Sequence, residues 1–133
     1  MTQNTHRQVA IVTGASRGIG AEIAKRLSAD GFAVVVNYAN SASEADSLVA
    51  QLVAEGGQAI AVKANVANAD EVRKMFEATE QQLGKIDVLV NNAGIMKTMP
   101  IAETSDELFE QTFAINTRGT FNTLREASAR MND

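Results

Sequence analysis

The sequence predicts an α/β protein in which helices cover both faces of a doubly wound, parallel sheet. Two observations predict this class. Short apolar runs alternate with amphipathic stretches whose apolar residues recur at helical spacing. The runs are continuously apolar, which is typical of strands that helices bury on both faces. Right-handed crossovers then predict the strand order 3-2-1-4. The four expected strands are residues 9–13, 32–36, 59–62 and 86–90.

The first two helices are expected between the first three strands. The first follows a glycine-rich segment, because apolar residues then recur at helical spacing until Gly31 ends the pattern. The second is expected to begin at Ser41. This residue has capping-box spacing with Glu44, so that each side chain satisfies the other's backbone N–H. Gly56 is expected to end this helix.

The second half of the chain repeats the alternation of strand and helix. Asn68 is expected to cap the third helix, which continues as far as Gly84. Thr104 and Glu107 predict another capping box, which opens a long helix towards Met131. One face of this last helix carries the stripe Phe109, Phe113, Asn116, Thr120, Leu124 and Ala127.

The composition predicts a single domain over residues 1–133 and argues against several functions. Hydrophobic residues make up 45% and charged residues 21%, close to globular averages. The net charge of −4, without a long basic run, argues against nucleic-acid binding. The chain has no cysteine, and His6 is its single histidine, so no metal site is expected. No apolar run approaches the ~20 residues that cross a bilayer, and the polar start is unlike a signal peptide. A cytoplasmic protein without membrane partners is therefore expected.

The segment between the first strand and the first helix, residues 13–20, reads TGASRGIG. Gly14 is expected to make the turn off the strand, Gly18 to let a phosphate approach the backbone, and Gly20 to let the helix lie close to the sheet. Free N–H groups and the helix dipole would hold a pyrophosphate there, as in a Rossmann-type domain. The spacing G-x-x-x-G-x-G differs from the usual dinucleotide fingerprint, and the alternative is a structural turn. The predicted dinucleotide contacts are Gly14, Ser16, Arg17, Gly18, Ile19 and Gly20.

The end of the second strand predicts which dinucleotide would bind. An NAD site usually has an acidic residue there, which accepts a hydrogen bond from the ribose 2′-OH. This chain has Asn37 instead, so no carboxylate repels a 2′-phosphate. Arg17 in the glycine loop and the hydroxyl of Ser41 suit phosphate oxygens. These residues predict NADP in preference to NAD, the alternative being that Arg17 is an ordinary surface arginine.

Further motifs add a family resemblance. The third strand leads to Asn65-Val66, the fourth leads to the sequence NNAG at residues 91–94, and Asn116 lies on the last helix. With the glycine loop, this order resembles the classical short-chain dehydrogenases/reductases, and especially their 3-oxoacyl-carrier-protein reductase branch. The resemblance extends from about Gln8 to the last residue. The cofactor contacts that it adds are Asn65, Val66, Asn91, Ala93 and Gly94.

The resemblance also implies a role for each motif. Asn65 and Val66 would lie at the edge of the adenine, and Ala93-Gly94 would let the cofactor approach the backbone. Asn116 would be catalytic, by holding a water in the proton relay. The alternatives are ordinary strand-ending turns and, for Asn116, an amide bonded to backbone. Because Asn116 lies within the apolar stripe, its amide is expected to be buried and to have a partner.

The remaining catalytic residues that the resemblance implies are not in this chain. Family members use a serine and a Tyr-x-x-x-Lys motif, but the single tyrosine here, Tyr38, is followed four residues later by Ala42. Family members are also considerably longer. The 133 residues are therefore expected to be the N-terminal half of such a protein, truncated before the fifth strand and inactive alone.

The implied function is that of an NADP-dependent oxidoreductase, which transfers hydride between NADPH and a carbonyl or alcohol substrate. One alternative is a non-catalytic module that binds a dinucleotide without turnover. Another is an interaction fragment that binds no dinucleotide. An open fourth strand and an uncovered last helix would seek another chain. Homo-oligomerisation, or association with a C-terminal half, is therefore expected.

Overall fold

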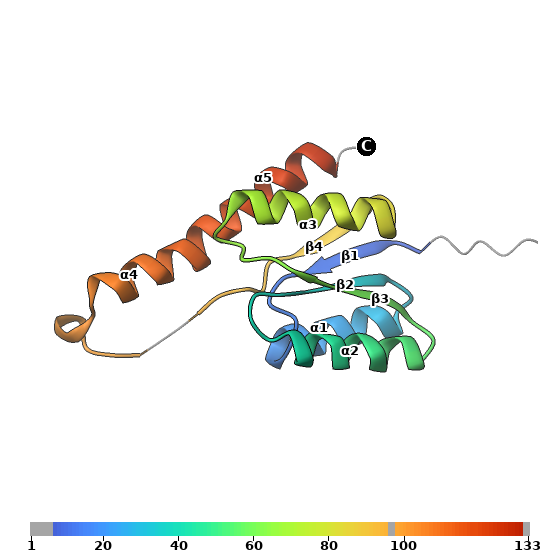
Figure 1. The fold of residues 1–133 in the computed structure, drawn as a ribbon, viewed down its shortest axis with the longest axis horizontal. Helices are drawn as coiled ribbons and strands as arrows, with labels where there is room; N and C mark the ends of the chain where they lie inside the picture. The colour runs from blue at the N-terminus through green and yellow to red at the C-terminus, as the bar shows by residue number, and fades with distance from the viewer. Residues whose placement is uncertain (1–6, 96–97, 132–133) are drawn as a thin grey trace, which may run out of the picture.

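The computed structural model describes residues 7–95 and 98–131, and it confirms the predicted α/β class. In this part of the chain, four parallel strands form one sheet in the order β3-β2-β1-β4 (Figure 1). The strands are β1 (Val9–Val12), β2 (Ala33–Tyr38), β3 (Gln58–Lys63) and β4 (Ile86–Val90). β2 is longer than its apolar run because Asn37 and Tyr38 still pair with β3.

Helices cover both faces of the sheet, as expected for continuously apolar strands. α1 (Gly18–Ala29) and α2 (Ala42–Ala54) lie on one face, and α3 (Ala69–Gln82) and α5 (Gly119–Arg130) lie on the other (Figure 1). Alternate residues of one strand serve the two faces, since successive side chains of a strand point in opposite directions. In β2, Val34 and Val36 pack in the α1–α2 cluster, whereas Val35 packs in the α3–α5 cluster.

The helix caps confirm one of the three capping predictions. Asn68 caps α3, because its Oδ1 accepts a hydrogen bond from the N–H of Glu71 at 3.0 Å. The capping box at Ser41 is wrong, since its side chain makes no cap bond and Glu44 faces Arg17 instead.

The third capping prediction is displaced by one residue. Ser105, not Thr104, caps α4 (Asp106–Phe113), and its Oγ accepts from the N–H of Leu108 at 3.0 Å. The hydroxyl of Thr104, which follows the 3-10 turn (Ile101–Glu103), donates to the carbonyl of Pro100, which precedes that turn. The hydroxyl of either Thr104 or Ser105 could cap a helix, so the backbone geometry decides which of the two residues does so.

The expected long helix is interrupted by a π-helical segment, Ala114–Arg118, which lies between α4 and α5. α5 packs beside α3, whereas α4 extends away from the sheet (Figure 1). On α4 the apolar stripe is therefore exposed, since Phe109 and Phe113 are more than half exposed. On α5 the stripe divides, because Leu124 is more than half exposed whereas Ala127 packs against the core. None of the helices within residues 7–95 and 98–131 is long and apolar enough to span a membrane.

The strand register brings the carboxyl ends of three strands together. Val12, the last residue of β1, pairs with both Val36 of β2 and Val90 of β4. The segments that leave these strands therefore emerge at one edge of the sheet. Ligands of open α/β sheets bind outside this edge, where the strand order reverses. In this chain the order reverses at β1, between β2 and β4.

Candidate functional site

A cleft of about 240 Å³ lies at this edge, and most of the predicted cofactor residues line it. β1 contributes the loop that follows it, and β2, β3 and β4 contribute the segments at their carboxyl ends. The predicted residues in the lining are Gly14, Ser16, Arg17, Asn37, Ser41, Asn65, Val66, Ala93 and Gly94. The predicted residues that do not line this cleft are Gly18, Ile19, Gly20 and Asn91.

The glycine loop comes so close to the end of β4 that larger residues do not fit. Gly14 has a φ of +62°, and a Cβ there would lie 2.9 Å from Cα of Ala93. A Cβ on Gly20 would lie 2.4 Å from the carbonyl oxygen of Gly14 and 2.5 Å from Nδ2 of Asn92. Gly20 therefore lets the start of α1 approach the loop itself.

The start of α1 has an open surface. Gly18 is exposed, its φ is +63°, and no atom lies within 4 Å of where its Cβ would stand. The next residue, Ile19, is 74% exposed. Free backbone N–H groups at such a helix start suit an anion. The loop thus combines a close backbone contact at Gly14 with open space at Gly18, which fits a phosphate group beside the helix.

The hydroxyl of Thr13 joins the glycine loop to the end of β4. This side chain is buried, and its Oγ1 accepts from the N–H groups of Asn92 at 3.0 Å and Ala93 at 2.9 Å. The same hydroxyl donates to the carbonyl of Val90 at 3.3 Å. Nδ2 of Asn92 in turn donates to the carbonyl of Gly14 at 3.1 Å. Sequence reasoning did not select Thr13 or Asn92, although both stand beside the glycines and asparagines that it selected.

Asn37 lies at the base of the cleft, and its side chain is committed to backbone groups. It is 1% exposed, and its Nδ2 donates to the carbonyls of Val62 and Ala64, each at 3.2 Å. Its Oδ1 accepts from the N–H of Gly14 at 3.1 Å. The amide therefore ties the glycine loop to the end of β3. Both of its N–H donors are used in this way.

Asn65 and Val66 follow β3 and have different environments. Oδ1 of Asn65 accepts from the N–H of Ala67 at 3.0 Å, which closes a local turn. Val66 is buried beneath α5, so close that a Cβ on Gly119 would lie 2.6 Å from its Cγ2. The carbonyl of Val66 accepts from Nδ2 of buried Asn122 at 2.9 Å. Sequence reasoning missed Asn122, because the predicted apolar stripe of the last helix does not include it, and only the packing of α5 buries its amide.

The structure does not bring Asn91 to the cleft. Its Oδ1 accepts from the hydroxyl of Thr123 on α5 at 2.6 Å, so its side chain ties the end of β4 to this helix. Its neighbours Ala93 and Gly94 do line the cleft. The asparagine pair at residues 91–92 is therefore divided: Asn91 bonds to α5, and Asn92 bonds to the glycine loop.

Asn116 lies in the π-helical segment, and both ends of its amide bond to one residue. Oδ1 accepts from the N–H of Ile95 at 2.8 Å, and Nδ2 donates to the carbonyl of Ile95 at 2.7 Å. The expected partner exists, but the expected burial is wrong because Asn116 is exposed. The side chain also lies beside the cleft wall, since a Cβ on Gly94 would be 3.2 Å from Oδ1 of Asn116.

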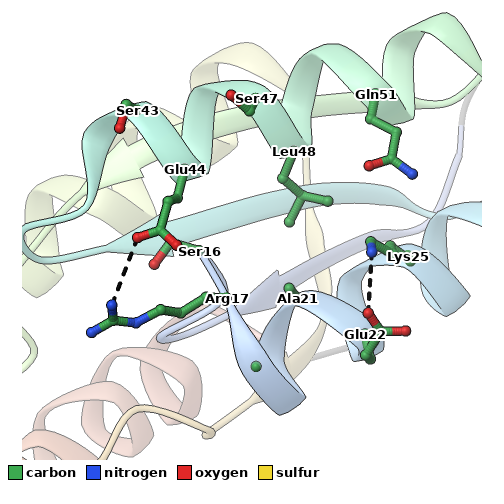
Figure 2. Close-up of a pocket in the computed structure, with 11 residues that line it drawn as sticks. Ser16, Arg17, Ala21, Glu22, Lys25, Ser43, Glu44, Ser47, Leu48 and Gln51 are labelled. Carbon is green, nitrogen blue, oxygen red and sulfur yellow. Dashed lines mark hydrogen bonds and ion pairs between the residues drawn. The ribbon is translucent and has the colours of Figure 1, made fainter.

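Arg17 dominates the electrostatics of the cleft. It has the one charged side chain among the described residues that line the cleft. Its guanidinium is 3.7 Å from the carboxylate of Glu44, and 75% of the side chain is exposed (Figure 2). No group of three or more potential metal ligands occurs within residues 7–95 and 98–131, and His6 lies outside the described residues.

Comparisons with known proteins agree on the family to which this site belongs. The family model for short chain dehydrogenases matches residues 8–133. A 3-oxoacyl-[acyl-carrier-protein] reductase of a Synechocystis species is 51% identical over 114 residues, which is 86% of this chain and 46% of that protein. The chain spans about half the length of the curated relatives it matches.

Two solved structures share the fold. A dehydrogenase/reductase of Sinorhizobium meliloti has a TM-score of 0.91 and 40% identity over 95% of this chain and 50% of its own. A short chain dehydrogenase of Burkholderia cenocepacia, solved in complex with NADP, has a TM-score of 0.90 and 37% identity. That likeness covers 98% of this chain and 54% of the Burkholderia chain.

Proposed function

This chain belongs to the short-chain dehydrogenase family, and from that premise we propose that it is the cofactor-binding portion of an NADP-dependent oxidoreductase. The proposed reaction transfers hydride between NADPH and a carbonyl or alcohol substrate. NADPH supplies the hydride when bound. The residues of this chain would bind and orient the dinucleotide along the cleft at the carboxyl ends of the strands. The Burkholderia structure with NADP supports this choice of ligand.

The proposed preference for NADP over NAD rests on the charge of the residues that line the cleft. Among the described lining residues, Arg17 brings the one full charge, and it is positive. Asn37 stands where an NAD site has an acidic residue, and its amide is buried against backbone. A 2′-phosphate would therefore meet a cation and no carboxylate within the lining. Arginine suits this task because its planar donors match phosphate oxygens.

The glycine loop would hold the remaining phosphates. The close contact of Gly14 with Ala93 and the open space at Gly18 leave room for these phosphates beside the start of α1. Asn65 and Val66, which line the cleft beyond β3, would lie beside the adenine. Asn116 would hold a water in the proton relay. Its amide bonds to Ile95 support a further task for it, which is to position the segment that follows Gly94.

A binding titration tests the proposal. We expect the protein to bind NADPH more tightly than NADH, as measured by nicotinamide fluorescence. The variant R17A should weaken NADPH binding by roughly 10- to 100-fold, the effect of losing a hydrogen bond to a charged group. It should leave NADH binding unchanged. K25A is the matched control, because Lys25 is a nearby cation, on α1, that does not line this cleft. Equal affinity for both dinucleotides would contradict the NADP preference.

A non-catalytic binding module is the second candidate function. It would use the same cleft, whose lining includes Tyr38, the one tyrosine of the chain, at the end of β2. Tyr38 is not followed by a lysine four residues later. Turnover of NADPH with a series of carbonyl substrates discriminates the two candidates. Tight NADPH binding without turnover by the whole protein would favour the module.

We also propose that the uncovered apolar surface of the chain is buried by association. On α4 and α5, the exposed side chains of Phe109, Phe113, Phe121 and Leu124 support this, because large exposed apolar patches usually mark interfaces. β4 pairs with β1 alone among the described strands and so lies at the sheet edge. Sedimentation should show a species larger than one chain. A monodisperse monomer with a high melting temperature would contradict this proposal.

A further inference from the structure

A second hollow adjoins the cleft and shares Arg17 with it. This groove, of about 410 Å³, lies between α1 and α2 (Figure 2). Ser16 and Arg17 line both the groove and the cleft, whereas Glu44 lines only the groove. Arg17 stands at the start of α1, where the two hollows meet. Its long side chain can therefore extend into the groove or into the cleft.

The ion pair with Glu44 draws Arg17 towards the groove. Figure 2 shows Glu44 on α2 facing Arg17 across the space between the helices. The nearest nitrogen and oxygen are 3.7 Å apart, and 48% of the Glu44 side chain is exposed. Lys25 pairs with Glu22 farther along α1, at 3.1 Å. Arg17 is thus the cation that Glu44 engages in this arrangement.

A phosphate bound by Arg17 would compete with Glu44. At 3.7 Å the contact between Arg17 and Glu44 is an ion pair and not a hydrogen bond, so Glu44 acts through its charge, which offsets part of the attraction that a phosphate would feel. The carboxylate would also repel a phosphate held within a few ångströms of it. Glu44 does not take part in a capping box with Ser41, because the predicted capping box is not formed. Its carboxylate is directed to Arg17 instead.

We infer that Glu44 is a specificity-determining residue, which competes for Arg17 and so lowers the preference of the protein for NADPH over NADH. The inference rests on the proposed function. Glu44 on α2 would repel the 2′-phosphate, whereas Arg17 at the start of α1 would attract it. Removal of this carboxylate should strengthen binding of the phosphorylated dinucleotide only.

The test compares dissociation constants of NADPH and NADH for the full chain and its variants. E44Q should bind NADPH about 2- to 5-fold more tightly, which is the usual range for an exposed ion pair. NADH affinity should not change. E44D retains the charge and should stay near the parent protein. D46N removes one negative charge from an exposed position of the same helix, and it should have a smaller effect.

A second arm repeats E44Q in an R17M background, where the gain should vanish. An equal gain without Arg17 would show a general charge effect and overturn the inference. So would unchanged or weaker NADPH binding by E44Q, provided that its circular dichroism matches the parent protein. If the parent binds NADPH and only the gain is missing, the inference fails alone. If it binds neither dinucleotide, the proposed function fails and the inference fails with it.

Discussion

The side-chain amide of Asn116 bonds both main-chain polar groups of Ile95, with Oδ1 accepting at 2.8 Å and Nδ2 donating at 2.7 Å. The pair joins the π-helical segment to the chain that leaves β4, across 21 positions of sequence. One amide thus holds the residue after Gly94 against the π-helical segment. This contact connects the wall of the cleft to the π-helical segment between α4 and α5.

Replacing Asn116 by alanine should loosen this segment. Two hydrogen bonds are lost, at about 0.5–1.5 kcal/mol each, and the exposure of the site favours the lower end. We expect a lower urea midpoint and faster hydrogen exchange of the Ile95 amide. T117A, at an exposed position of the same segment, is the control. Unchanged protection of Ile95 in N116A would refute the positioning role.

The buried hydroxyl of Thr13 offers a sharper test of how the cleft is built. T13V keeps the shape but leaves the N–H of Ala93 without its acceptor, whereas the N–H of Asn92 keeps its second acceptor, the carbonyl of Val90 at 3.1 Å. An unsatisfied buried group costs about 1–3 kcal/mol, so T13V should lower the free energy of unfolding by about this amount. T13S keeps the hydroxyl and should lose less. Equal stability of the two variants in urea denaturation would show that the hydroxyl contributes little.

Gly14 should tolerate substitution less well than another glycine that also has a positive φ. G14A combines a positive φ with a Cβ 2.9 Å from Cα of Ala93. G31A has a φ of +97° but no atom near its Cβ, so it serves as the control. The left-handed backbone alone costs about 1–2 kcal/mol, and G14A should exceed that. Thermal unfolding measures the stability of both variants. A similar loss of stability in G14A and G31A would mean that the contact with Ala93 relaxes readily.

Acid should weaken the first turn of α3. A hydrogen bond from Arg73 and the charge of Arg73 hold the pKa of the Asp70 carboxyl below its ordinary value. The folded-state pKa is thus lower than the unfolded one, near 3.9. The stabilisation is present above the unfolded pKa and is lost as the pH falls through the folded value. NMR titration should show R73Q raising the pKa of Asp70. If Asp70 had the same titration curve in R73Q as in the parent protein, Arg73 would not be the cause of its lowered pKa.

Sequence patterns predicted those parts of the fold that depend on neighbouring residues. The cap at Asn68 needs only a suitable side chain three residues before an N–H, and it formed. The capping box at Ser41 has equally suitable spacing but did not form, since Glu44 meets Arg17 from another helix. Local spacing permits a bond, and a distant competitor decides whether it is made.

The candidate site shows the same division. The positions of the glycine loop and of residues 91–94 at the carboxyl ends of strands follow from the strand pattern, and most predicted residues do line the cleft. Asn91 was predicted there by resemblance, yet it bonds Thr123 of α5. Thr13 and Asn92 were missed because their importance lies in bonds between β1 and β4, across about 80 positions of sequence.

By itself, the sequence determined the class of this protein, its strand order and the edge of the sheet where its polar motifs gather. Continuous apolar runs and glycines act locally, so their consequences can be derived from neighbouring positions. Only the tertiary structure decided that Asn37 is committed to backbone, that Asn116 holds Ile95, and that Arg17 meets Glu44. An amide or a charge accepts many partners, and packing of distant elements selects among them.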